Sequence, residues 1–226
     1  MSDADHLLLA LQHGDSFFPS GAVSFSWGLE TLAAEGKLAS AEAVTGFVEG
    51  QLRFRWAELD RVALVLAHRA GGRLEETAGV DRALEAQTLA AELRDGSRRT
   101  GAALLGVHEK LGTPGARDYR DLLRRGQVPG HGAAVQGLLW SAVGLSERAA
   151  VSLSAHTLSV GLLGAALRLG LIGHLDAQRS LAKLRLVIEP LIDSPPLVLG
   201  KMRSFSPEAE IAAMRHETAG MRLFAN

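Results

Sequence analysis

Three short stretches of the sequence carry side chains that could form or break bonds. FFPSGAVSFSWGLETL at 17–32 places serines beside glycines, SLAK at 180–183 spaces a serine three residues before a lysine, and RHETAG at 215–220 begins like a zinc-protease motif. A nucleophile elbow needs Gly-x-Ser-x-Gly after a strand, but Ser24 stands where the first glycine belongs. The companion motifs of Ser-x-x-Lys enzymes are missing, and Gly220 occupies the position of the second zinc-binding histidine. None of the three stretches completes a known catalytic pattern.

The sequence also lacks the patterns that hold phosphates or metal ions. A phosphate-binding loop needs Gly-x-x-x-x-Gly-Lys-Ser/Thr, which does not occur, so we expect no bound nucleotide. The 8 histidines never stand three or four residues apart, the helical spacing that aims two imidazoles at one metal. Cysteine is absent, which excludes thiolate ligands, disulfides and a cysteine nucleophile. We therefore expect no cofactor and no resident metal ion.

Charge and hydropathy narrow the classes of partner. The 24 basic and 25 acidic residues give a formal net charge of −1, so bulk electrostatics does not favour nucleic acid or an anionic membrane. The N-terminus lacks the basic region of a secretory signal. The longest apolar stretch, at 158–173, is interrupted by Arg168 and is shorter than a membrane span. We expect a cytoplasmic protein that contacts neither nucleic acid nor membrane.

Helical periodicity runs through almost the whole chain. With 47% hydrophobic but only 5% aromatic residues, the core must consist mainly of alanine, leucine and valine, of which the first two favour helices. Alternating strand patterns are missing, so the sequence predicts one compact all-α domain of about ten helices over residues 1–226. The helices predicted in the middle of the chain span 41–69, 80–94, 97–111, 117–125, 131–144, 147–169 and 176–192.

Two helices are predicted before residue 41. The stretch ADHLLLALQ at 4–12 is apolar on most sides, which predicts a short interior helix. After the break at Pro19–Gly21, a helix is expected from about residue 22 to residue 34, and Phe25 and Leu29 are expected in the core. The apolar stripe that predicts this second helix consists of Ala22, Phe25, Leu29 and Leu32.

The last segment, 206–226, combines a helix with an unusual tail. Ser206 can cap the helix, and Pro207 fits its first turn. Phe224 adds an apolar group where chain ends are usually polar. A mostly apolar stripe is formed by Ile211, Met214, Thr218 and Met221. Charges without an opposite partner three or four residues away in the same helix are carried by Glu208, Glu210, Arg215, Glu217 and Arg222. We therefore predict a helix and tail that dock onto another segment or another protein.

Three stretches of the chain together resemble a known family. FFPSGAVSFSWGLE near the start, ALRLGLIGH late in the chain and SFSPEAEIAAMRHETAGMRLFAN at the end are similar to the urease accessory protein UreF family. The first and third matches are long enough to be specific, and all three follow in the family's order. Ser20, Phe25 and Trp27 depart from the residues common in the family, and these departures put contact details in doubt but not the helix.

The resemblance implies a non-enzymatic, all-helical protein that acts in urease maturation. Such proteins form homodimers and bind a second accessory protein of the UreD type, also called UreH. That complex recruits the GTPase UreG, modulates its GTP-dependent action and delivers nickel to apo-urease. By motif match, partner contact is expected at Pro19, Gly21, Ser26, Gly28, Glu30, Arg215, His216, Glu217, Arg222, Leu223 and Phe224.

The two matched ends suggest specific roles. Gly28 is expected to leave room for a close neighbour, and Arg215 and Arg222, seven residues apart, could clamp carboxylates across an interface. We expect the last helix and tail to become ordered on binding the UreD-like partner. Two alternatives remain open. One is a serine hydrolase that uses Ser26 or Ser180 with a histidine. The other is a helical regulator that binds a small molecule in a pocket lined by Phe17, Phe18, Phe25 and Trp27.

Overall fold

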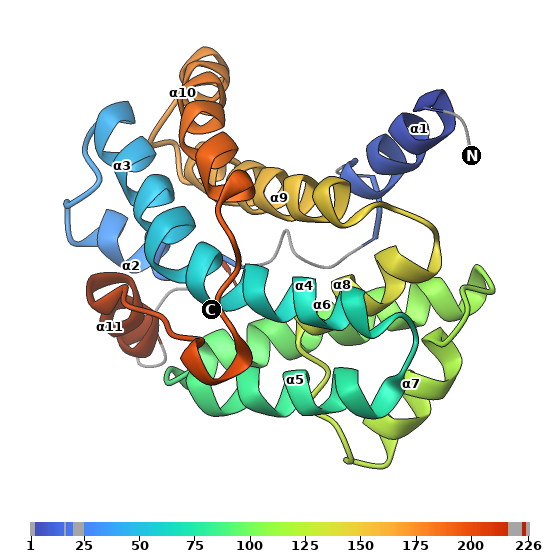
Figure 1. The fold of residues 1–226 in the computed structure, drawn as a ribbon. Helices are drawn as coiled ribbons and strands as arrows, with labels where there is room; N and C mark the ends of the chain where they lie inside the picture. Colours follow the sequence, from blue (N-terminus) through green and yellow to red (C-terminus); the bar gives the residue numbers. More distant parts are fainter. Residues whose placement is uncertain (1–2, 16, 20–24, 217–222, 225–226) are drawn as a thin grey trace.

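Helices α4 (Arg61–Ala70) and α8 (Gly132–Ala142) form the most extensive helix pair of the computed structural model (Figure 1). A Cβ added at Gly137 of α8 would lie 2.3 Å from the Leu64 carbonyl oxygen of α4. Only glycine therefore allows the two backbones to pack this closely. The structure describes residues 3–15, 17–19, 25–216 and 223–224.

One long helical rod leads into this centre. Helix α3 (Ala41–Gln51) starts at Ser40, whose hydroxyl accepts from the Ala43 amide at 3.1 Å. It continues through the π-helical segment η2 (Leu52–Asp60) into α4 without a break. The helix predicted over 41–69 is therefore confirmed, although its π-helical middle is not visible in the apolar spacing.

The largest core cluster lies between this rod, α9 (Glu147–Arg168) and α10 (His174–Asp193). By length and composition α9 could cross a membrane, but 56% of its most apolar window is buried inside the protein, as expected for a core helix. Helix α1 (Asp3–Gly14) packs on α9. The prediction that α1 is an interior helix is wrong, because it lies at the surface with one face inward. Its outward leucines, 60–66% exposed, are Leu7, Leu8 and Leu11.

A second cluster joins α8 to α5 (Leu74–Gln87), α6 (Ala91–Lys110) and α7 (Ala116–Arg124). The break predicted at residues 95–96 is wrong, since both residues lie inside α6. The chain turns instead at residues 88–90, where Thr88 caps its own helix end by donating to the Leu84 carbonyl at 2.9 Å.

A buried carboxylate fixes the loop between α7 and α8. Asp81 of α5 accepts from the Tyr119 hydroxyl at 2.9 Å and from the amides of Gly130 and His131 at 2.7 and 2.9 Å. Its side chain is fully buried, and burial raises the pKa of this carboxyl above its usual value. Asp81 thereby sets the point at which α8 begins.

The helices that carry the N-terminal and C-terminal motifs, α2 (Leu29–Ala34) and α11 (Pro207–His216), lie side by side at one edge of the fold (Figure 1). A short 3₁₀ turn, η3 (Leu199–Lys201), precedes α11. The helix predicted over 22–34 starts only at Leu29, because Trp27 and Gly28 have φ of 56° and 85°, which no right-handed helix contains. Within the described ranges every regular element is helical, so the predicted all-α class is confirmed.

Candidate partner-docking site

The carboxylate of Glu30 joins the two sequence motifs that lie farthest apart in the chain. Its Oε2 atom accepts from His216 Nε2 at 2.9 Å and from the Phe224 amide at 3.2 Å, and its Oε1 atom accepts from the Leu223 amide at 2.7 Å. The Glu30 side chain is 14% exposed, and that of His216 is 1% exposed. A single side chain in the first turn of α2 therefore holds the end of α11 and the chain that follows it.

The face of α11 that meets α2 is built from alanine. Ala209, Ala212 and Ala213 are buried there, and a Cβ added at Gly28 would lie 2.5 Å from the Ala209 carbonyl oxygen. The positive φ of Gly28 is a second reason why glycine stands at this position. The prediction that Gly28 leaves room for a close neighbour is confirmed, and that neighbour is α11.

Residues 25–27, which precede α2, also pack at the contact between α2 and α11. Ser26 is fully buried, and Phe25 is 6% exposed, as expected for a core residue. The Trp27 indole lies between the body and α11, with the Arg55 guanidinium carbon 4.8 Å from the ring centroid. The stretch predicted to contact a partner therefore also packs inside this chain. We call the contact of residues 25–30 with α11 and residues 223–224 the joint.

Phe224 closes the same joint from the C-terminal side. Its side chain is 6% exposed, and the guanidinium carbon of Arg168, at the end of α9, lies 4.7 Å from its ring centroid. A cation over an aromatic face is favourable, more so where water is excluded. The apolar tail residue predicted to dock onto something thus packs against this chain itself.

Charged groups line the outer edge of the joint. Arg215 Nη1 lies 2.9 Å from Glu35, and Lys37 Nζ lies 3.0 Å from Glu35 and 3.4 Å from Glu208. Hydrogen bonds from Lys37 and then Arg215 lower the pKa of Glu35, while Glu35 and Glu208 raise the pKa of Lys37. The partner charges predicted for Arg215 and Glu208 on another segment are confirmed by these ion pairs with Glu35 and Lys37.

The outward face of α11 leaves its larger apolar groups in solvent. Ile211 is 47% exposed and Met214 is 43% exposed, and Leu223 beyond the helix is 61% exposed. The sequence stripe that contains Ile211 and Met214 therefore does not face the core, because the close approach at Gly28 admits only alanine. Thr218 and Met221, the other members of that stripe, lie outside the described residues.

Comparison with known proteins agrees with these motifs. The UreF family model matches residues 38–185. A urease accessory protein UreF of Trichodesmium erythraeum (strain IMS101) is 37% identical over 100% of this chain and 99% of its own length. The chain belongs to the UreF family. A urease accessory protein UreF 1 of Brucella melitensis is 28% identical over 97% of this chain, and a UreF of Yersinia pestis (strain Pestoides F) is 28% identical over 99% of it.

The residues selected by the UreF resemblance fall into three groups. Buried ones are Ser26, Gly28, His216 and Phe224, and Glu30 is partly buried among them. Exposed ones are Pro19, Arg215 and Leu223. Outside the described residues lie Gly21, Glu217 and Arg222, so the proposed clamp of Arg215 with Arg222 stays a prediction. The structure brings the described members from both ends of the chain together around Glu30, except Pro19, which has no described contact there.

Sequence reasoning did not assign a role to Arg168 or Arg55, whose guanidinium groups lie over Phe224 and Trp27. Arg55 stands three residues before Glu58, the spacing of an ordinary helical charge pair, so the sequence did not indicate that it lies over Trp27. In the part of the chain that the structure describes, no group of three histidine or acidic residues is placed to hold a metal ion.

Proposed function

We propose that this UreF-family chain is a non-enzymatic accessory protein that works by binding other proteins during urease maturation. It bridges a UreD- or UreH-like protein and a UreG-like GTPase, and it modulates GTP-dependent nickel insertion into apo-urease in the cytoplasm. Family membership and the fact that its relatives are named urease accessory proteins support the general role. The bridging, the homodimer and the nickel step are proposed from the family resemblance.

The observation that carries a binding role is the composition of the joined surface. Exposed apolar side chains at Ile211, Met214 and Leu223 stand beside the ion pairs of Glu35. Protein interfaces commonly combine an apolar centre with a charged rim in this way. An isolated helix that only needed to fold onto its own chain would gain free energy by burying its isoleucine and methionine instead.

The buried and exposed members of the motif take different roles in this proposal. Glu30, Gly28 and His216 position α11 and the segment at residues 223–224. The exposed side chains then contact the UreD-like protein. Changes at the buried members should therefore act on the shape of the surface, and changes at Ile211 or Met214 should act on the contact itself.

The hydrolase alternative has little support from the geometry. The Ser180 hydroxyl shares a hydrogen bond of 2.8 Å with the Thr45 hydroxyl, and Ser26 is fully buried. Nucleophilic serines need an adjacent general base and access to substrate. Of the pocket imagined for the small-molecule alternative, Phe17 is 93% exposed and Phe18 lies 5.0 Å from the His13 ring, so neither shares a cavity with Trp27.

Co-expression with the UreD-like protein tests the proposal. The double variant Ile211→Asp with Met214→Asp should keep its helical circular dichroism but lose co-elution in size-exclusion chromatography, and urease activation should fall with it. Leu111→Asp, a change of the same kind at a 59% exposed leucine on the far end of α6, is the matched control. Undiminished co-elution of the double variant, or equal loss in the control, would contradict the assignment of this surface.

A further inference from the structure

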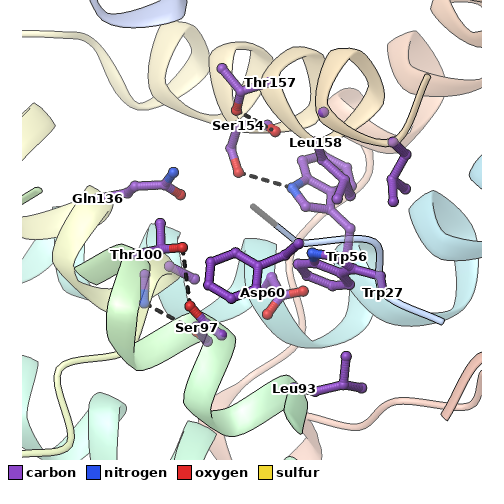
Figure 2. A pocket seen from close by; sticks show the side chains of 16 residues that line it. Trp27, Trp56, Asp60, Leu93, Ser97, Thr100, Gln136, Ser154, Thr157 and Leu158 are labelled. Carbon is purple, nitrogen blue, oxygen red and sulfur yellow. Dashed lines mark hydrogen bonds between the residues drawn. The ribbon is translucent and has the colours of Figure 1, made fainter. Parts of the chain in front are cut away.

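A cavity of about 110 Å³ lies between the joint and the centre of the fold, lined by residues of η2, α6, α8 and α9 and by Phe25 and Trp27 (Figure 2). Aromatic rings form part of its wall, since Trp56 of η2 lines it together with Phe25 and Trp27. An engineered cavity of about 150 Å³ accommodates benzene, so this one has room for roughly four or five non-hydrogen atoms. It is thus suited to a very small organic molecule.

The cavity contains a carboxylate that lacks a hydrogen-bond donor. Asp60 at the end of η2 is only 8% exposed, and its buried Oδ2 atom receives no hydrogen bond from any described residue. Arg55 Nε lies 3.4 Å from Asp60 Oδ2, but neither of these two buried atoms makes a hydrogen bond. Burial raises the pKa of the Asp60 carboxyl, and the nearby charges of Arg55 and His131 offset this only in part. A buried carboxylate of this kind gains most from a ligand that brings N–H groups.

Other polar groups of the cavity wall can donate hydrogen bonds. Ser154 Oγ accepts from the Trp56 indole N–H at 3.1 Å, and Ser97 Oγ accepts from the Gly132 amide at 3.1 Å. Each serine hydroxyl hydrogen therefore remains available for another acceptor. The Gln136 side-chain amide lies on the same wall in Figure 2. These groups can bind a carbonyl oxygen while Asp60 accepts from N–H groups.

We propose that this cavity binds a small planar molecule of the amide and urea class, with its N–H groups on Asp60 and its carbonyl oxygen on the Ser97, Ser154 or Gln136 side chains. The flat body of such a molecule matches the aromatic part of the wall. The site is built on a π-helical segment, a feature often found at functional sites. The best small ligands gain about 1.5 kcal/mol of binding free energy per non-hydrogen atom, so a ligand of four or five atoms binds with a Kd no tighter than a few micromolar.

Two glycines of α9 provide a matched pair of variants. Gly161 lines the cavity, whereas Gly164 does not, and a Cβ added at either one meets nothing within 4 Å. Both lie inside the same helix, where leucine is more favourable than glycine. Gly161→Leu should therefore fill the cavity without loss of folding, and Gly164→Leu should leave it open.

Acetamide is a suitable probe, because its methyl signal reports binding to the full chain by saturation-transfer difference NMR. We expect saturable binding that urea displaces, loss of binding in Gly161→Leu and wild-type binding in Gly164→Leu. Asp60→Asn should weaken binding roughly fivefold to tenfold, since a charged acceptor forms the stronger hydrogen bond. Acetate, which has the same shape but no N–H group, should not bind.

Several results would overturn the proposal. Absence of saturable acetamide binding, equal binding in the folded Gly161→Leu variant, or unchanged affinity in Asp60→Asn would each do so. Guanidinium binding without acetamide binding would show a site for cations instead. Because none of these measurements involves another protein, they are independent of whether the chain bridges UreD- and UreG-like partners.

Discussion

Replacing Glu30 should release the C-terminal segment while leaving the rest of the fold in place. The carboxylate accepts three hydrogen bonds, from His216 Nε2 and from the amides of Leu223 and Phe224. Hydrogen bonds to a charged group contribute about 1.5 to 3 kcal/mol each, but the exposed Leu223 amide can turn to water. The other two bonds, at the lower limit of this range, give about 3 kcal/mol by which Glu30→Ala should make local opening easier.

Amide hydrogen exchange measures this change directly. A loss of about 3 kcal/mol corresponds to roughly 160-fold faster exchange at residues 223–224, at about 1.4 kcal/mol per tenfold. Glu30→Gln keeps one oxygen as acceptor, so it can still serve His216 and Phe224 and should lose only about 1 kcal/mol, or roughly fivefold. Exchange in the α4–α8 centre should not change in either variant.

Glu35→Gln is the matched control, because it also breaks a contact between this region and α11. Its ion pair with Arg215 is more exposed, so the expected cost is below about 1 kcal/mol. Wild-type exchange in Glu30→Ala, or an equally large effect in Glu35→Gln, would refute the assigned role of the Glu30 carboxylate. If Glu30→Ala opens the segment but binds the UreD-like partner as tightly as wild type, the segment has no part in docking.

Three further changes test the fold. Asp81→Ala leaves three buried donors without an acceptor and should lower the free energy of unfolding by about 3 kcal/mol or more in urea titrations. Gly137→Ala should force α8 away from α4, since its Cβ would lie 2.3 Å from a backbone oxygen, and a melting temperature equal to wild type would contradict this. Burial, aided by His13, lowers the pKa of His108 from 6.5 to about 4, so the unfolded chain binds more protons between these values. The free energy of unfolding should be highest above about pH 6.5 and fall by up to about 3 kcal/mol toward pH 4. In His108→Gln the free energy of unfolding should depend less on pH over this range.

The helical class and most helix bounds could be predicted from sequence because apolar spacing reports local structure directly. The errors occurred where tertiary contacts decide. The stripe that begins at Phe25 has helical spacing, yet the left-handed backbone at Trp27 and Gly28 delays the helix to Leu29. Residues 95–96 contain an aspartate and a glycine typical of a turn, yet α6 runs through them because Gly96 packs against the Phe25 ring, 3.0 Å from an added Cβ.

The motif residues could be selected from sequence, but their arrangement could not. The resemblance selected Glu30, His216 and Phe224 without indicating that Glu30 contacts the other two, which lie more than 180 positions away in the chain. Nothing in the sequence indicated that Asp60 lines a cavity, because a single acidic residue at the end of an amphipathic stretch is common. Its burial follows from packing of four separate segments around it.

The way α11 is attached explains why the Glu30 change should act locally. Alanine side chains bury little apolar surface, so the contact of Ala209, Ala212 and Ala213 with Gly28 contributes less than a leucine-rich face of equal length would. Directional bonds at Glu30 and the Arg168–Phe224 contact therefore supply a large share of the attachment. Such a segment can be released by changing a few bonds, without disrupting the leucine-rich core. A protein that must present the exposed face of α11 to a partner benefits from this separation, because the docking segment can rearrange while the body stays folded.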